Sequence, residues 1–140
     1  LPTDCRKLWA RHAYLKEKAG SGPLWICKPS DQSRGRNISI VDDPSTVANR
    51  HGMVAQRYIE HPMLLGGYKV DLRVYVLVIS VHPLAIYICK DGIARMATKK
   101  YGGALCEDRF SHLTNTSINK QSPTYPIDKE VIGPGCKWSI

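Results

Sequence analysis

Residues 67–80 read Gly-Tyr-Lys-Val-Asp-Leu-Arg-Val-Tyr-Val-Leu-Val-Ile-Ser, and this pattern predicts the main strand of the second half of the chain. Charged side chains occupy alternate positions at Lys69, Asp71 and Arg73, and the rest of the stretch is almost wholly apolar. Period-two alternation places the three charges on one face of one strand. We expect this strand over 68–80, with 74–79 buried, so that the charges lie where a core strand emerges into a cleft.

The sequence after this strand predicts a three-stranded antiparallel meander. His82-Pro83 turns the chain, 84–89 returns it, Asp91-Gly92 is a hairpin signal, and 93–98 returns it again. Arg95 then lies on a returning strand beside the charged face. Two arginines and a lysine beside one carboxylate indicate an anion-handling site, and salt bridging on a solvent-exposed face is the alternative.

The first 59 residues predict a small α/β lobe. An amphipathic helix is expected over 5–18, strands over 24–28, 38–41 and 53–59, and a helix over 46–50 capped by Ser45. Lys28 ends the first strand, where its ammonium needs water or an anion; a surface charge is the alternative. The polar loop that follows contains Arg34, Gly35 and Arg36, whose donors could hold phosphate oxygens, although it is not a Walker loop.

Composition limits the classes of protein to which the chain can belong. The 140 residues carry 20 Lys plus Arg against 12 Asp plus Glu, a net charge of +8, which indicates either a polyanionic partner or a solvated basic surface. The longest apolar run, 74–81, is too short to span a membrane. Five widely spaced cysteines favour reduced thiols in the cytosol. Leu1 and the apolar end at 138–140 suggest a piece of a longer protein.

Downstream, a short polar stretch contains His112, which we interpret as a packed or capping histidine rather than a general base. No arrangement of residues typical of a covalent nucleophile is found. Several motifs occur together in one chain: Trp25-Ile-Cys-Lys-Pro29, Ser33-Arg-Gly-Arg36, Gln56-Arg-Tyr-Ile-Glu60, Gly67-Tyr-Lys-Val-Asp-Leu-Arg-Val-Tyr-Val-Leu77, Arg95-Met-Ala-Thr98 and His112-Leu-Thr-Asn115.

Together these motifs resemble the tubulin tyrosine ligase-like family, and residues 130–138 resemble its polyglutamylase-type branch. The resemblance implies an α+β fold of the ATP-grasp type, present in part. Residues 1–59 would be part of the central lobe and residues 60–140 a truncated C-terminal lobe with an antiparallel sheet, with ATP between them. The resemblance implies these nucleotide-binding residues: Lys28, Arg34, Gly35, Gln56, Arg57, Tyr58, Ile59, Lys69, Asp71, Thr114 and Asn115.

The reaction implied by the resemblance is amide ligation, in which ATP phosphorylates a carboxylate and an amine attacks the acyl phosphate. Arg73 and Arg95 would act in catalysis, because cationic donors stabilise the developing charge. The incoming amino acid would contact Arg95, Thr116, Ser117 and Lys137. Two residues depart from the family pattern, Asn37 in place of a glycine and Thr116 in place of a tyrosine. The Mg²⁺ ligands are expected beyond residue 140, none within this chain.

The resulting hypothesis is a ligase that adds amino acids, glutamate first among them, to glutamate side chains of acidic tubulin tails. A tubulin glycylase, a tyrosine ligase and a catalytically inactive, basic microtubule-binding scaffold are the alternatives. A nucleic-acid partner is not expected, because aromatic residues are not interleaved with the basic ones as a base-stacking surface requires. A membrane partner is not expected, because no apolar run is long enough to form a membrane-spanning helix. We expect a cytoplasmic, cytoskeletal location, with the cilium or flagellum axoneme and the basal body as finer candidates.

Overall fold

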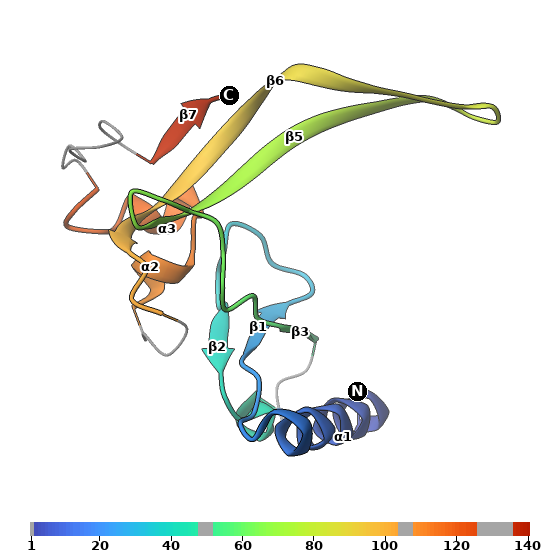
Figure 1. Ribbon diagram of the computed structural model, residues 1–140, viewed down its shortest axis with the longest axis vertical. Helices are drawn as coiled ribbons and strands as arrows, with labels where there is room; N and C mark the ends of the chain where they lie inside the picture. Colours follow the sequence, from blue (N-terminus) through green and yellow to red (C-terminus); the bar gives the residue numbers. More distant parts are fainter. Residues whose placement is uncertain (1, 48–51, 104–107, 126–135) are drawn as a thin grey trace. The chain divides into compact units, whose positions relative to one another are not determined.

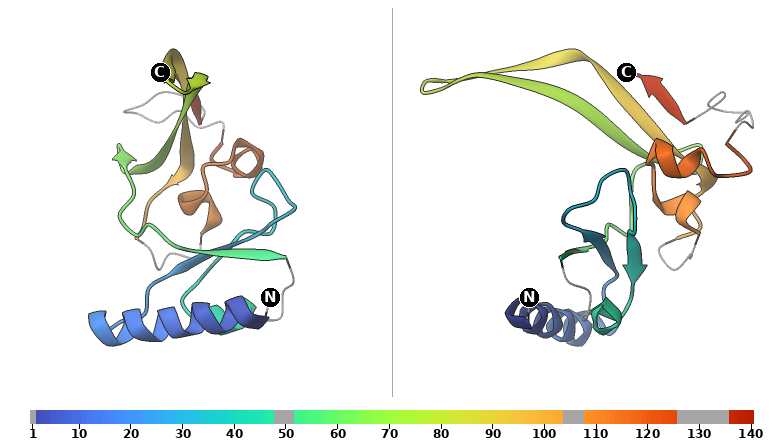
Figure 2. Two further views of the ribbon diagram at one scale, coloured as in Figure 1. Left: turned by 90° about the vertical axis from the view of Figure 1, so that its right-hand side faces the viewer. Right: turned by 180° about the vertical axis from the view of Figure 1, so that it is seen from behind.

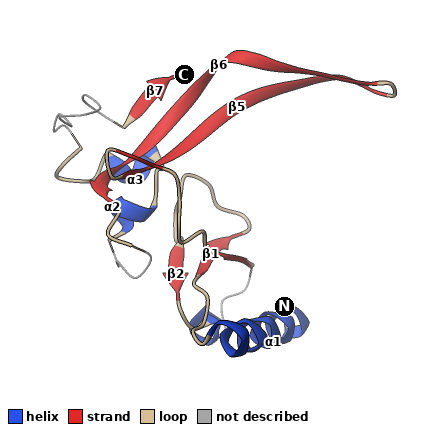
Figure 3. Cartoon of the chain, in the orientation of Figure 1, coloured by secondary structure: helices blue, strands red, loops and turns tan. Residues whose placement is uncertain are grey.

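The computed structural model describes residues 2–47, 52–103, 108–125 and 136–140, and the chain divides into two units, Leu1–His61 and Pro62–Ile140. The division lies two residues beyond the lobe boundary expected from the sequence. The identity of the two units as ATP-grasp lobes stays a prediction. Helices and antiparallel sheets occur in the same chain, so the fold is α+β (Figure 3).

The first unit combines one long helix with a three-stranded antiparallel sheet (Figure 1). Its elements are α1 (Pro2–Ala19), β1 (Trp25–Pro29), β2 (Ser39–Val41), the 3₁₀ helix η1 (Pro44–Val47) and β3 (Met53–Arg57), with strand order β2-β1-β3. Leu8 and Leu15 of α1 pack against the core formed by Trp25, Cys27 and Val47. The helix expected over 5–18 is therefore confirmed, because its two leucines, seven residues apart, face this core.

The capped helix expected after residue 45 is only partly seen. Its residues 48–50 lie outside the described residues, and Thr46 and Val47 belong to η1. Ser45 as the capping side chain is wrong. Ser45 lies inside η1, which begins at Pro44, and Asp43 Oδ1 accepts a hydrogen bond from Ser45 N at 2.8 Å. The carboxylate before the helix therefore caps it, because it can reach a first-turn amide.

The second unit is a four-stranded antiparallel sheet with two short helices at one end of its long hairpin (Figures 1 and 2). The strands follow the order β4-β5-β6-β7 and comprise β4 (Leu64–Leu65), β5 (Tyr68–Val81), β6 (Leu84–Lys100) and β7 (Lys137–Ser139). The helices are α2 (Arg109–His112) and α3 (Thr116–Asn119). Val70, Met96 and Ala97 are among the buried apolar residues of this unit.

The expected hairpin at Asp91-Gly92 is wrong, because β6 continues through these residues as one strand and the meander has two long strands rather than three. Gly92 pairs with Val74, next to a bulge. A Cβ on Gly92 would lie 2.8 Å from the Arg73 carbonyl oxygen and 2.7 Å from the Ile140 side chain. The glycine therefore permits close packing inside the sheet, which the Asp-Gly dipeptide alone does not distinguish from a turn.

The expected burial of 74–79 is also wrong. Every residue of this stretch is exposed, and Leu77 and Ile79 keep 57% and 63% of their surface. Between Val74 and Gly92, toward its turn, the hairpin consists of β5 and β6 alone among the described elements. The elements α2, α3 and β7 lie near the opposite end of the hairpin (Figure 1). An apolar run indicates burial only where another layer covers the strand.

Candidate anion site on the β5–β6–β7 sheet

Three sequence-predicted residues form one row across the sheet of the second unit. Asp71 on β5 pairs with Arg95 on β6, and Arg95 pairs with Lys137 on β7. Directly paired residues on neighbouring strands direct their side chains to the same face. The register therefore places a carboxylate, a guanidinium and an ammonium side by side, although they are up to 66 positions apart in the sequence.

Lys69 lies two residues before Asp71 on the same face and is partly buried. Its Nζ donates a hydrogen bond to the His112 carbonyl oxygen at 2.9 Å. Burial lowers the pKa of Lys69 below its usual value of 10.5, while the nearby charge of Asp71 raises it. Desolvation of the ammonium dominates, so a further negative charge near Lys69 would be stabilising.

Thr114 connects the segment after α2 to this face of the sheet. Its Oγ1 donates a hydrogen bond to Asp71 Oδ2. Asp108 is the N-cap residue of α2, the helix that precedes this segment. Its Oδ1 accepts a hydrogen bond from Phe110 N at 2.9 Å, and its Oδ2 accepts one from Lys99 Nζ at 2.5 Å. A capping carboxylate paired with a β6 lysine thus fixes the start of α2 against the sheet.

Arg95 has an unsatisfied donor. Its Nε atom is buried and has no hydrogen-bond partner within the described part of the chain. A buried donor without a partner costs about 1 to 3 kcal/mol, and more when it is charged. An anionic ligand on this face would supply the missing acceptor. Arg73, by contrast, is exposed and pairs with Ile93, two residues farther along the hairpin than Asp71.

The remaining predicted residues of the second unit lie at the start of α3. Asn115 is the N-cap residue and its side chain makes no capping hydrogen bond. Thr116 is half-buried and Ser117 is exposed. These residues follow Thr114 directly in the sequence, so they lie close to the hydrogen bond between Thr114 and Asp71. Of the branch-specific motif at 130–138, residues 130–135 lie outside the described residues.

In the first unit, Lys28 and Gln56 are brought together. Lys28 Nζ on β1 donates to Gln56 Oε1 on β3 at 3.1 Å, and both side chains lie on one face of the small sheet. Lys28 therefore has a polar partner on the neighbouring strand.

Three residues of the loop after β1 have a left-handed backbone. Arg34, Gly35 and Asn37 have φ values of 62°, 80° and 53°. Asparagine tolerates this region far better than most residues. Asn37 thus adopts the left-handed conformation that the glycine expected from the resemblance would adopt without strain.

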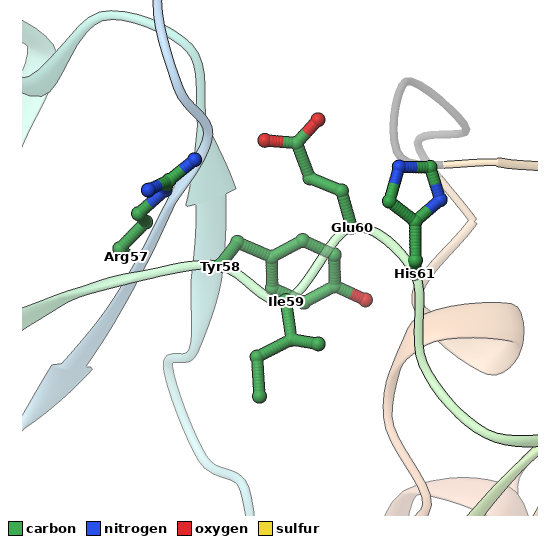
Figure 4. A pocket seen from close by; sticks show the side chains of 5 residues that line it. All are labelled: Arg57, Tyr58, Ile59, Glu60 and His61. Atoms are coloured by element: carbon green, nitrogen blue, oxygen red, sulfur yellow. The ribbon is translucent and has the colours of Figure 1, made fainter. Parts of the chain in front are cut away.

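Residues Arg57–His61 line an open hollow of about 490 Å³ in the first unit. Tyr58 is buried, and its backbone N–H donates to the Leu24 carbonyl at 2.8 Å, so this amide is already engaged. Ile59 is 66% exposed and points away from the side on which Glu60 and His61 extend (Figure 4). Ile59 can therefore offer an apolar surface to a ring-shaped ligand.

His112 and Asn119 are buried polar residues of the second unit. His112 is 2% exposed and packs edge-on against Tyr101 with ring centroids 5.3 Å apart, which confirms its interpretation as a packed histidine. Sequence reasoning gave no role to Asn119, which is fully buried and bonded to both β6 and the 113–115 segment. Its only sequence signal was the concentration of amides and hydroxyls between residues 112 and 120.

Among the residues that the structure describes, no group of three His, Cys, Asp or Glu side chains is arranged to hold a metal ion. The expectation that Mg²⁺ ligands lie beyond residue 140 stays a prediction. None of the described helices is both long enough and apolar enough to cross a membrane.

Comparison with known proteins identifies the class of this chain. The tubulin-tyrosine ligase family matches residues 2–140. The chain is 45% identical over 141 residues to "Probable tubulin polyglutamylase TTLL2" of Mus musculus, and the match covers 100% of this chain and 26% of the relative. It is 41% identical over 133 residues to "Tubulin polyglutamylase TTLL5" of Homo sapiens, covering 92% of this chain and 10% of the relative. It is 37% identical over 143 residues to "Tubulin monoglutamylase TTLL4" of Mus musculus, covering 100% of this chain and 12% of that protein.

The chain belongs to the tubulin-tyrosine ligase family, as its motifs predict. It spans about a quarter or less of the length of these relatives.

Proposed function

We propose that the whole protein is an ATP-dependent amide-forming ligase that adds glutamate to glutamate side chains in tubulin tails. The family assignment and the names of the relatives, which are tubulin polyglutamylases and a monoglutamylase, support this proposal. The ATP-grasp fold, a cytoskeletal location and the finer assignment to a cilium or basal body are part of the same proposal.

The unsatisfied Nε of Arg95 lies on the same sheet face as the desolvated ammonium of Lys69. This arrangement supports the proposed ligase chemistry. Both groups would gain from an anion, and the residues present therefore fit a phosphate or carboxylate group. When bound, ATP would supply the phosphoryl group that activates a substrate carboxylate for attack by an amine.

The chain's own residues would bind and orient the reactants. Arg95 would hold a carboxylate by two parallel hydrogen bonds, since its fork matches that geometry. Lys69 would stabilise negative charge on a transferred group, and Arg73 would add to the positive potential. Asp71, held by Thr114, would fix the orientation of the neighbouring cations.

Other predicted residues keep supporting roles in the proposal. Lys28, Arg34 and Gly35 are candidates for phosphate contacts, and Gln56–Ile59 for adenine contacts. Asn115 would contact the nucleotide, whereas Thr116, Ser117 and Lys137 would contact the incoming amino acid.

The outer side of α1 supports an acidic partner such as a tubulin tail. Lys7, Arg11, Tyr14 and Lys18 recur at spacings of four, three and four residues, so they lie along one side of the helix. Arg11 Cζ and Lys18 Nζ lie 5.3 Å and 5.9 Å from the centre of the Tyr14 ring. This side presents three cations over roughly 16 Å, which an extended acidic segment of about five to six residues would span.

The proposal is tested by measuring ATP hydrolysis by the full-length protein with tubulin and one amino acid at a time. Hydrolysis stimulated by glutamate, and lost when the acidic tails are removed or salt is raised, is the expected result. Stimulation by glycine or tyrosine instead would replace the polyglutamylase reading with one of the alternative ligases. Salt-sensitive tubulin binding without hydrolysis would identify an inactive scaffold.

A further inference from the structure

Asn119, at the end of α3, is fully buried and uses all of its hydrogen-bonding capacity. Its Oδ1 accepts from Thr98 N at 2.9 Å and from Thr98 Oγ1 at 2.8 Å. Its Nδ2 donates to the carbonyl oxygens of Leu113 at 2.7 Å and Asn115 at 3.1 Å. A side-chain amide offers two donors and two acceptor positions, and here all four are occupied.

The two carbonyls that Asn119 holds flank Thr114, the residue bonded to Asp71. The carbonyl immediately before them, that of His112, accepts the hydrogen bond from Lys69. One side-chain amide thus fixes the backbone on both sides of the Thr114 contact, next to the Lys69 contact.

The other end of Asn119 is anchored to β6, the strand that carries Arg95. Thr98 lies three residues beyond Arg95 and is 4% exposed. Since backbone atoms of β6 and of the 113–115 segment both bind one rigid amide, the segment cannot shift along the sheet without breaking at least two hydrogen bonds, of which at least one is buried. Such losses are costly because no water replaces the missing partners.

We propose that Asn119 is a positioning residue for the anion site, holding the 112–115 segment in register with β5 and β6 so that Thr114 meets Asp71 and the His112 carbonyl meets Lys69. This inference rests on the proposed function, because it assumes that the site binds ATP. Asn119 itself touches no reactant in this proposal. It acts through Thr114 and the His112 carbonyl.

The test uses the full-length protein and the Asn119→Asp variant, which keeps an acceptor for Thr98 and loses the donor to Leu113 and Asn115. ATP affinity is measured by calorimetry at a temperature where melting curves show the variant to be folded. We expect ATP affinity to fall about 10- to 100-fold, which is the loss expected when one charge-assisted hydrogen bond between ATP and the site is broken. Asn119→Ser, which is smaller and uncharged, serves in the same way if the aspartate variant does not fold.

Ile118→Ala is the matched control, because Ile118 is a buried neighbour in α3 whose side chain bonds to nothing in the site segment. It should lower the melting temperature while leaving ATP affinity within about twofold of the wild type. Wild-type ATP affinity in a folded Asn119 variant, or an equal loss in Ile118→Ala, would overturn the positioning role. Failure of the wild-type protein itself to bind ATP would instead refute the proposed function.

Discussion

Replacement of Lys69 by methionine separates a ligand-binding role from a structural one. The substitution removes a desolvated ammonium and its 2.9 Å hydrogen bond to the His112 carbonyl. The lost charged hydrogen bond costs about 1.5 to 3 kcal/mol. Relief of the ammonium's desolvation offsets this cost, because methionine needs no hydration. We therefore expect the free energy of unfolding to change by no more than about 1 kcal/mol.

The effect of Lys69→Met on ATP binding should be much larger. Loss of one charge-assisted contact worth about 1.5 to 3 kcal/mol weakens binding roughly 10- to 150-fold. Calorimetric titration of the full-length protein with ATP measures this change, and thermal melting measures stability. Lys90→Met is the matched control, because Lys90 is exposed on the far part of β6. Unchanged ATP affinity together with a large drop in stability would refute the role of Lys69 in anion binding.

Three further predictions concern the sheet of the second unit and Asp108, the N-cap residue of α2. Arg95→Lys keeps the charge but loses the fork, so the apparent KM for the amino acid should rise at least about tenfold while ATP affinity stays near that of the wild type; the opposite pattern in steady-state kinetics would reverse this division of roles. The hydrogen bond from Lys99 lowers the pKa of Asp108 below its usual value of 3.8, so its stabilisation is present above pH 3.8 and is lost as pH falls through the folded-state pKa. Asp108→Asn should therefore cost about 1 kcal/mol of unfolding free energy at pH 7 and less at low pH, and a cost that persists in acid denaturation experiments would contradict this. Changing the exposed cross-strand pair Val76 and Ile88 to threonines should reduce binding of a hydrophobic dye to the chain and alter unfolding free energy by less than about 0.5 kcal/mol per site, whereas a steep fall in melting temperature would mean that both are buried.

The local elements could be predicted where one period dominates the sequence. The leucines of α1 and the alternating charges of β5 follow helix and strand periods, and these elements occur as expected. The turn predicted at Asp91-Gly92 was wrong, because an Asp-Gly dipeptide looks the same in the sequence whether the glycine forms a turn or permits close packing inside a sheet. Burial at 74–79 could not be predicted, because it depends on whether another layer covers the hairpin.

The candidate site was predicted only in part for a related reason. The alternation of Lys69, Asp71 and Arg73 predicts a shared face from sequence alone. The direct pairing of Asp71 with Arg95, and of Arg95 with Lys137, depends on register, which no local pattern specifies. Asn119 was missed because its four hydrogen-bonding partners come from β6 and the segment after α2, which only tertiary structure brings together.

The most direct test of the proposed ligase activity is mass spectrometry of tubulin tail peptides after incubation of tubulin with the full-length protein, ATP, Mg²⁺ and glutamate. We predict ATP-dependent addition of glutamyl residues, attached through amide bonds to glutamate side chains of the tails, and loss of this addition in the Lys69→Met variant. Tails that remain unmodified with ATP and glutamate present, or glutamyl addition that proceeds equally well without ATP, would contradict this function.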